Sequence, residues 1–321
     1  MNEEKRNEYL KKYVRTGADF VQKRSCNPYP QMKTDSLRLD VLPDFSGNGG
    51  SVLWTNIYEP VNMQPVAVVS ERSLYISVFG GVATDYSKLY GEVEVTLGRN
   101  KDDLRKFTFD EAVCVYVKKG MMYSVNIKKI DAPARPIHYN ELVLGDAALT
   151  TDKFPDDDGA SLETYLRTGS DIYGNYPDKE HIPCPVMRTD NTMFATNEIM
   201  HRTWVPITSP YIMAKAPHTH ECPEILMVYG SDPENISDLG GVVEFTIGET
   251  PETLVQFVVD KATAFSAPNG LWHCPLVFRK VNDPEKPIMF CEISYAEGLV
   301  QDRKLEDTIV EDELLSTSGD Y

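Results

Sequence analysis

The feature that most constrains the fold of this chain is an internal repeat, because its 321 residues match themselves at a shift of 150. The segment KLYGEVEVTLG (88–98) aligns with DLGGVVEFTIG (238–248), and glycines, prolines and a tryptophan elsewhere align at the same shift. Near the start of each copy, YVRTGAD (13–19) aligns with YLRTGSD (165–171) at a shift of 152. A match that covers nearly the whole chain indicates tandem duplication of one folding unit.

Each copy of the repeat has the pattern of β-strands. GEVEVTLG (91–98) and GVVEFTIG (241–248) alternate apolar and polar residues with a period of two, and short β-branched or aromatic runs between Gly and Pro turns follow them. Helical patterns are confined to the beginning of the chain, a stretch near SLETYLR, and the acidic tail. We therefore predict an all-β protein of two tandem antiparallel β-barrels with a few short helices.

The boundary between the two copies is predicted from composition. The segment DKFPDDDGAS (152–161) is rich in Asp, Pro and Gly, as a linker should be. We assign residues 1–150 to an N-terminal domain and residues 151–321 to a C-terminal domain. The segment before Asp35 is expected to pack across the other barrel.

Composition and charge limit the kinds of molecule that this chain can bind. The formal net charge of −17 argues against nucleic acid or an anionic membrane surface, because both would repel the chain. The first residues, MNEEKRNEYLKKY, lack the apolar core of a signal peptide, and no stretch approaches the ~20 apolar residues that span a bilayer. The six cysteines show no CxxC spacing, which favours reduced thiols. We therefore expect a cytoplasmic protein with no membrane or nucleic-acid partner.

The strongest chemical signal is the segment PHTHECPE, which holds two of the six histidines in the chain. Residues two apart in a strand project from one face, so His218 and His220 point together, and Glu224 has the same parity beyond a turn. His273, in the segment APNGLWHC, is the obvious fourth group from a neighbouring strand. Imidazole and carboxylate without thiolate suit Mn, Fe, Zn, Ni or Cu and can leave positions open for a substrate.

These residues carry a family resemblance. The pattern H-x-H-x3-E at 218–224 and the pattern P-x-G-x2-H at 268–273 resemble the two signature motifs of the cupin superfamily. In that family the motifs supply four metal ligands inside a small antiparallel barrel. The resemblance therefore implies one divalent metal ion per chain (Mn, Zn or Fe), bound by His218, His220, Glu224 and His273. The gap between the motifs is long, and Val277 stands where many cupins have an asparagine. The motifs cover the C-terminal half only, so the whole chain resembles a bicupin.

The duplication provides an internal control for the proposed ligands. At a shift of 150, the matching positions of the first copy hold neither imidazole nor carboxylate: they are Val68, Ser70, Leu74 and Tyr123. The glycines, prolines and tryptophan that shape the barrel are kept in both copies. Histidines that served only as core packing would have little reason to differ together. We predict that the C-terminal barrel alone binds a metal, while the N-terminal barrel serves the fold and the assembly.

Two further residues are candidates for binding the substrate. Trp204 can line a pocket, but Trp54 occupies the matching place in the metal-free copy, which favours a core role. Arg279 has the parity of His273 along its strand and can meet an anionic substrate. However, Lys129 matches Arg279, so a solvated surface cation is the alternative interpretation.

The chemistry of the site leaves three hypotheses. A divalent ion can polarise a carbonyl, stabilise an enolate or lower the pKa of bound water, and all three uses favour small oxygenated substrates. The leading hypothesis is non-redox cleavage of a carbon–carbon bond in an enolisable keto or hydroxy substrate of the β-dicarbonyl type, by a hydrolase or decarboxylase. The second is an Fe(II) dioxygenase acting on a diketone, phenolic or thiol substrate. The third is a metabolite-binding bicupin that is not an enzyme.

Two thiols near the proposed ligands and the resemblance to cupins lead to two further expectations. Cys222 and Cys274 lie close to the ligands but at positions that turn them away, so we predict that they do not bind the metal. Thiols this near mildly disfavour oxygen chemistry, because an oxygen-activating metal would oxidise them. The resemblance to cupins, which commonly dimerise through edge strands, implies a homo-oligomer.

Overall fold

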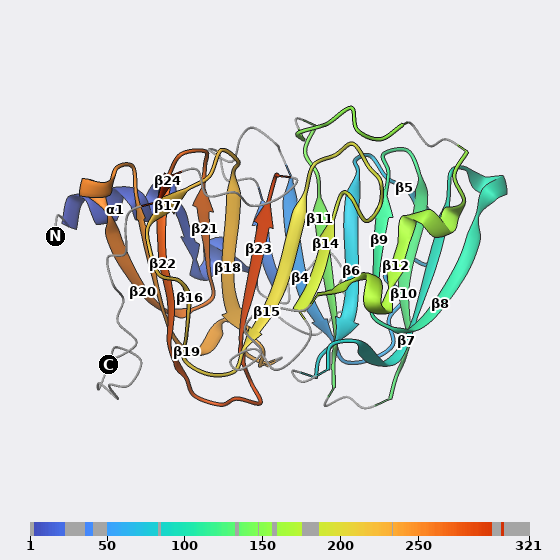
Figure 1. The fold of residues 1–321 in the computed structure, drawn as a ribbon. Helices are drawn as coiled ribbons and strands as arrows, with labels where there is room; N and C mark the ends of the chain where they lie inside the picture. Colours follow the sequence, from blue (N-terminus) through green and yellow to red (C-terminus); the bar gives the residue numbers. More distant parts are fainter. Residues whose placement is uncertain are drawn as a thin grey trace.

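The computed structural model describes residues 3–22, 36–40, 50–82, 85–131, 135–146, 148–155, 159–174, 186–232, 234–296 and 303–304. These residues form two β-barrels that stand side by side (Figure 1). Each barrel is made of a larger and a smaller sheet, and the paired strands are antiparallel. The prediction of an all-β chain with two antiparallel barrels is therefore confirmed.

The N-terminal barrel contains strands β2 (Val21–Gln22), β3 (Ser36–Asp40), β4 (Ser51–Ile57), β5 (Val68–Val69), β6 (Leu74–Gly80), β7 (Lys88–Gly98), β8 (Arg105–Glu111), β9 (Val113–Val117), β10 (Met122–Ile130), β11 (Ile137–Val143) and β12 (Leu166–Thr168). Its seven-stranded sheet has the order β12-β9-β6-β11-β4-β3-β2, and its four-stranded sheet has the order β5-β10-β7-β8. The predicted alternation is visible in β7, where Leu89, Val93 and Val95 are fully buried, whereas Tyr90, Glu92 and Glu94 are partly exposed.

The C-terminal barrel contains strands β1 (Val14–Thr16), β13 (Tyr173–Gly174), β14 (Val186–Asp190), β15 (His201–Ile207), β16 (Tyr211–Ala214), β17 (His218–Thr219), β18 (Glu224–Gly230), β19 (Asp238–Gly248), β20 (Val255–Lys261), β21 (Thr263–Ala267), β22 (Trp272–Val281), β23 (Ile288–Ser294) and β24 (Arg303–Lys304). Its seven-stranded sheet has the order β1-β21-β18-β23-β15-β14-β13. Its second sheet has the order β20-β19-β22-β17-β24, and β16 also pairs with β22.

Helices are few and short. Helix α1 (Glu3–Lys12) begins with glutamates and ends with lysines, an arrangement that suits the helix dipole. The stretch near SLETYLR forms a single 3-10 turn, Leu162–Tyr165, before β12 begins. Further 3-10 turns span Gly17–Asp19, Lys101–Asp103, Gly169–Asp171 and Pro251–Thr253. The helix expected in the acidic tail lies outside the described residues.

The strands of the two barrels correspond along the chain. Strands β6, β7, β8 and β9 recur at a shift of 150 as β18, β19, β20 and β21 with the same lengths. Strand β10 recurs as β22, which is one residue longer, and from there the shift becomes 151, as between β11 and β23. The repeat in the sequence is therefore a repeat of one barrel.

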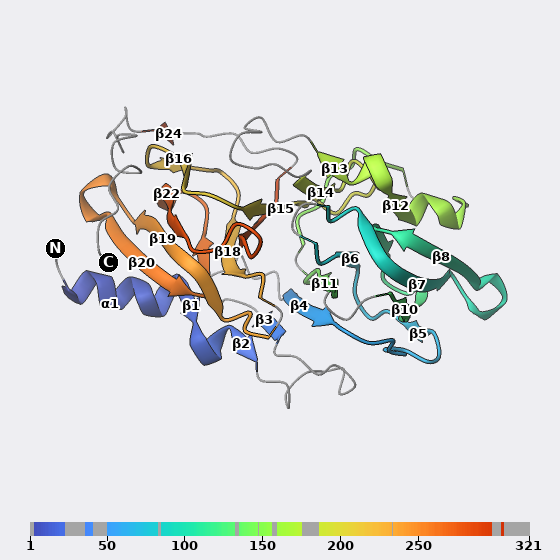
Figure 2. The same ribbon diagram turned by 90° about the horizontal axis from the view of Figure 1, so that it is seen from below.

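The two copies exchange their first strands. Strand β1 pairs with β21 of the C-terminal barrel, and the matching strand β12 pairs with β9 of the N-terminal barrel. Helix α1 lies along the C-terminal barrel in both ribbon views (Figures 1 and 2). Its Tyr9 is fully buried and accepts a hydrogen bond from the Glu249 backbone, while Lys12 forms an ion pair with the Glu249 side chain at 3.0 Å. Residues 3–16 therefore pack across the other barrel, as expected, whereas residues 23–35 of the predicted segment lie outside the described residues.

Alternation along the strands separates two hydrophobic layers. In β18, Leu226 and Val228 belong to the core inside the C-terminal barrel. Ile225, Met227 and Tyr229 belong to a second core, which fills the N-terminal barrel and continues through the layer between the two large sheets. This alternation identifies the face of each strand that lines the barrel interior.

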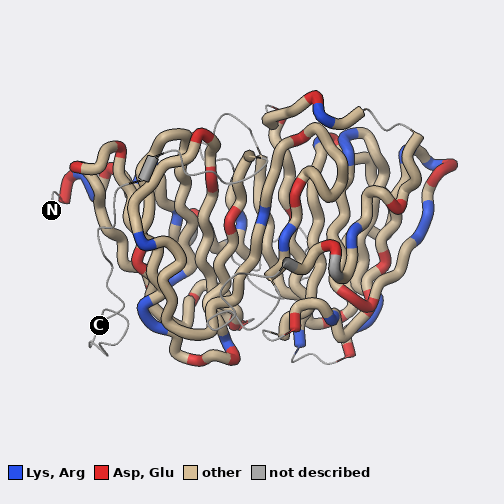
Figure 3. Tube along the Cα trace, in the orientation of Figure 1, with Lys and Arg blue, Asp and Glu red and all other residues tan. Residues whose placement is uncertain are grey.

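Charged residues occur along both barrels in the described part of the chain (Figure 3). No helix among the described residues is long and apolar enough to cross a membrane.

Candidate metal centre in the C-terminal barrel

Two short segments bring the predicted ligands together. His218 opens β17 and lies directly opposite His273 of β22 in the strand register. A turn with Gly270 at φ +75° precedes β22, and such a positive φ favours glycine. The Gly270 amide donates a hydrogen bond of 2.9 Å to the carbonyl of His220, which ties the two segments together. Glu224 opens β18, on the neighbouring sheet.

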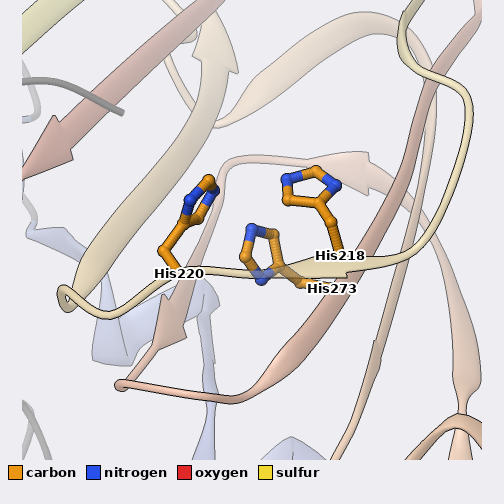
Figure 4. Close-up of side chains that lie close together, drawn as sticks. All are labelled: His218, His220 and His273. Atoms are coloured by element: carbon orange, nitrogen blue, oxygen red, sulfur yellow. The ribbon is translucent and has the colours of Figure 1, made fainter. Parts of the chain in front are cut away.

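The three histidine rings meet at one place. One ring nitrogen from each of His218, His220 and His273 lies within 4.8 Å of the others, and Figure 4 shows the rings grouped together. The Glu224 carboxylate completes the cluster, with Oε2 at 3.1 Å from Nε2 of His273 and at 4.0 Å from Nε2 of His220. All four side chains are buried, none more than 5% exposed. In the part of the chain that the structure describes, no second group of this kind is found.

In the rings of His218 and His273, a hydrogen bond to a backbone carbonyl fixes which nitrogen is available to a metal. Nδ1 of His218 lies 3.0 Å from the carbonyl of Ala216, and Nδ1 of His273 lies 3.0 Å from the carbonyl of Leu271. A carbonyl can only accept, so each Nδ1 carries the hydrogen and each Nε2 presents a lone pair. This second contact is typical of metal-binding histidines. Burial, together with the neighbouring His273, lowers the pKa of His218 to about 4, so its ring is neutral near pH 7.

The Glu224 carboxylate fits a cation. With the hydrogen of His273 on Nδ1, its Nε2 faces the Glu224 oxygen lone pair to lone pair, and the buried Oε2 has no hydrogen-bond partner. Burial opposes ionisation of this group, and positive charge at the adjacent imidazoles, His273 first, lowers the pKa of Glu224 below its ordinary value; a bound cation would act in the same direction. Three imidazole nitrogens and one carboxylate oxygen therefore offer the donor set of a divalent ion such as Mn, Zn or Fe.

The comparisons with known proteins agree with this geometry at the level of fold. The sequence matches no protein-family model and no curated protein. A serine-to-alanine mutant of Bacillus subtilis oxalate decarboxylase superimposes with a TM-score of 0.52 at 13% identity, over 90% of this chain and 78% of that chain. Two further structures of oxalate decarboxylase, one described for its substrate binding mode and one for its Mn(II) centres in the Bacillus subtilis enzyme, give TM-scores of 0.51 at 12% identity over the same shares. This chain has the fold of a bicupin.

The first copy of the repeat has residues at the positions of the four proposed ligands, but these residues cannot bind a metal in the same way. Tyr123 lies opposite Val68 in the register, as His273 lies opposite His218. Val68 is 44% exposed, and the hydroxyl of Ser70 donates to the carbonyl of Arg72. The sequence alignment of the two copies at these positions is therefore confirmed.

A second carboxyl group, which the sequence pattern did not reveal, lies next to Glu224. Glu292 on β23 hydrogen-bonds to Glu224. Burial and the negative charge of Glu224 raise the pKa of Glu292 well above its ordinary value, so Glu292 carries the proton of the pair. No spacing in the sequence points to Glu292, because it reaches Glu224 only through the pairing of β18 with β23.

The two residues proposed for substrate binding lie away from the histidines. Trp204 is 1% exposed and packs between the barrels, 6.4 Å from Trp54 ring to ring, as the core interpretation of this residue predicts. Arg279 forms an ion pair of 2.7 Å with Glu244, and its side chain is only 10% exposed, so the interpretation as a solvated cation is wrong.

The parity argument for Arg279 is also corrected by the structure. Cys274 and Pro275 together oppose the single residue Thr246, and this bulge reverses the alternation after His273. Phe278 therefore faces the barrel interior and Arg279 the opposite side. The residue of the first copy that corresponds in register is Lys128 rather than Lys129.

The thiols near the site do not join the cluster of ligand atoms. Cys222 is partly exposed and Cys274 is buried, and neither forms a disulfide. Burial, and after it the charges of Glu224 and Glu292, raise the pKa of Cys274 well above its ordinary value, so this thiol is protonated.

A separate cavity of about 300 Å³ is lined by residues from both halves of the chain, and the histidines do not line it. Its walls include Tyr116, Tyr165 and Phe194, with Lys119 and Glu198 among its polar residues.

Proposed function

We propose that this bicupin is a metal-dependent enzyme that breaks a carbon–carbon bond of a small enolisable keto or hydroxy substrate without redox change. One divalent ion, Mn, Zn or Fe, would be held by the three histidines and Glu224. The observation that carries the proposal is the convergence of three buried imidazoles on a carboxylate oxygen that has no hydrogen-bond partner. The similar structures support the class, since oxalate decarboxylase by its name removes a carboxyl group and one of its structures is described through Mn(II) centres.

A divalent ion bound there supplies a Lewis acid that polarises a substrate carbonyl and stabilises negative charge on its oxygen. The protein supplies the orientation: the carbonyls of Ala216 and Leu271 hold two of the rings, and the turn at Gly270 sets the third against them. Burial of all four groups removes competing water and strengthens electrostatic interactions inside the site.

Glu292 is the group that we assign to proton transfer. Cleavage of a carbon–carbon bond leaves an electron pair on carbon, which must take a proton. In a decarboxylation, carbon dioxide leaves and a proton replaces it; in the hydrolysis of a 1,3-dicarbonyl, water adds its hydroxyl to the acyl fragment and a proton goes to the other carbon. A carboxylic acid that stays protonated beside Glu224 can deliver that proton.

The test begins with the metal content of protein purified without oxygen. We expect about one divalent ion per chain, and the variant His220→Ala should lose it. Protein loaded with Mn or Zn should then convert a β-dicarbonyl or a β-keto acid, with acetylacetone, acetylpyruvate and oxaloacetate as the panel, in the strict absence of oxygen. The product acids and ketones are measured by chromatography.

Each alternative result has a distinct meaning. If no member of the panel is turned over without oxygen, the non-redox proposal fails. Oxygen consumption that requires both iron and substrate would identify a dioxygenase instead. Ligand binding that survives His218→Ala and Glu224→Gln without any turnover would identify a metabolite-binding protein. A cytoplasmic location and a homo-oligomeric state remain predictions, the second testable by light scattering.

A further inference from the structure

The large sheet of the C-terminal barrel carries two polar rows on its inner face. Residues directly opposite each other in paired strands share a face, and the strand order β18-β23-β15-β14 fixes which residues these are. The first row is Glu224, Ser294, His201 and Asp190, and the second row is Leu226, Glu292, Thr203 and Arg188. Leu226 belongs to the barrel core, which identifies the inner face. The rows lead from the metal ligand Glu224 to Arg188.

These rows contain polar atoms that nothing in the described chain satisfies. Two buried atoms between Glu224 and Arg188 have no hydrogen-bond partner in the described chain: Nδ1 of His201 and Oγ of Ser294. Ser294 is fully buried. Because buried polar atoms in proteins are nearly always hydrogen-bonded, two exceptions on directly opposed residues mark a place that a polar ligand can complete.

Arg188 stands at the open end of the rows with a fixed orientation. Its side chain is 49% exposed, and its Nη2 lies 3.1 Å from Oδ2 of Asp190. Asp190 in turn accepts hydrogen bonds of 2.9 and 3.0 Å from the backbone amides of Thr192 and Met193, so it holds the guanidinium in place. The charge of Arg188 acts on both His201 and Glu292, which places it within electrostatic reach of the rows.

A planar guanidinium with free N–H groups is the preferred partner of a carboxylate. Three strand spacings of about 4.8 Å and two residues along the strand separate Glu224 from Arg188, so their backbones are ~16 Å apart. The polar residues between them suit a substrate with an oxygen pair at one end and a separate carboxylate at the other.

We propose that the substrate is an anionic dicarbonyl acid, which lies along these rows with its carboxylate on Arg188 and its two carbonyl oxygens toward the histidines and Glu224. Asp190 acts as a positioning residue for Arg188. The inference rests on the proposed function and goes beyond it by naming the charge of the substrate and the residue that selects it.

The experiment compares two probes that differ by one carboxylate. Acetylpyruvate carries a carboxylate where acetylacetone carries a methyl group, and both are 1,3-dicarbonyls. Calorimetry on zinc-loaded full-length protein measures their dissociation constants without turnover. We expect acetylpyruvate to bind roughly tenfold tighter or more, as for a hydrogen bond to a charged group. Arg188→Gln should abolish this preference and leave the affinity for acetylacetone and the zinc content unchanged.

Two further variants guard the interpretation. Arg188→Lys keeps a positive charge but lacks the planar guanidinium with its parallel N–H groups. This variant should therefore show part of the preference that Arg188→Gln loses. Arg279→Gln removes the guanidinium that pairs with Glu244 on the side of β22 that faces away from the barrel interior. This variant should keep the full preference. Equal binding of both probes by the wild type, or an unchanged preference in Arg188→Gln, would overturn the inference and leave the proposed function standing. Binding of neither probe to the zinc-loaded wild type would overturn the proposed function and this inference with it.

Discussion

The chemistry of the C-terminal barrel is set by single hydrogen bonds. The carbonyls of Ala216 and Leu271 each take the Nδ1 hydrogen of a histidine, and this leaves the Nε2 lone pairs directed at one place. The same geometry leaves the inner oxygen of Glu224 facing a lone pair rather than a hydrogen. A cation between them would relieve this repulsion. Glu224 should therefore contribute more to metal affinity than the residues next to it in the sequence.

Glu224→Gln tests this argument with the least change in shape. The amide keeps the size of the side chain but loses the charge, so we expect the affinity for the divalent ion to fall by about tenfold or more. Metal content after dialysis against a chelator is the measurement. Glu221→Gln is the matched control, because Glu221 is exposed and one residue from His220. Full metal content in Glu224→Gln would contradict the assignment of this residue as a ligand.

Local spacing explains which site residues the sequence could predict. His218, His220 and Glu224 lie within seven positions, and a strand pattern is enough to bring them together. Glu292, Ser294 and His201 reach the site through the order of strands in the sheet, which no spacing reveals. Arg188 is remote from the motifs in the sequence for the same reason.

At the level of strands, the repeat in the sequence predicts the lengths of the strands well. It predicts less well which side chains face the barrel interior. Strands β6 to β9 recur with unchanged lengths, because the alternation and the bounding glycines are copied. The bulge at Cys274 and Pro275 occurs in β22 only, and it reverses the parity on which the expectation for Arg279 depended. One added residue therefore changes which side chains face the barrel interior, and an alignment of two copies cannot show it.

The layer between the two large sheets is apolar with a few polar groups set into it. Arg202 is fully buried, lies 4.2 Å from the ring of Trp204 and donates to the side chains of Asn140 and Ser77. His138 of β11 is 2% exposed and contacts Asn56 and the ring of Trp54. These groups make the contact between the sheets sensitive to pH.

His138 should make the fold less stable in acid. Burial lowers the pKa of His138 from 6.5 to about 3. Between these values the unfolded chain binds a proton that the folded protein does not, so the free energy of unfolding decreases as pH falls, by about 1.4 kcal/mol per pH unit from this group. Urea unfolding of the wild type and of His138→Gln at pH 7, 6 and 5 should show curves that converge toward low pH. Parallel curves would contradict a neutral buried histidine.

On the scale of the whole molecule, the barrels depend on each other in two ways. Each first strand completes the sheet of the other barrel, and one hydrophobic core continues from the N-terminal barrel into the layer that covers the C-terminal sheet. The duplication and the packing of the N-terminal segment could be predicted from the sequence. The shared core could not, because alternation shows that a face is buried and not what covers it.

A chain that begins near Glu163 should therefore aggregate. It lacks β1, so the outer edge of β21 at Thr263–Phe265 is unpaired, and it exposes Ile225, Met227 and Tyr229 of the large sheet to water. Removal of residues 1–16 alone is the graded control: it leaves the shared core intact, so we expect a soluble protein with a lower melting temperature. Size-exclusion chromatography with light scattering and metal analysis distinguishes these outcomes. A soluble, fully active half with one ion per chain would refute the structural role of the N-terminal barrel, since the second copy would then hold its metal ligands in place without the first.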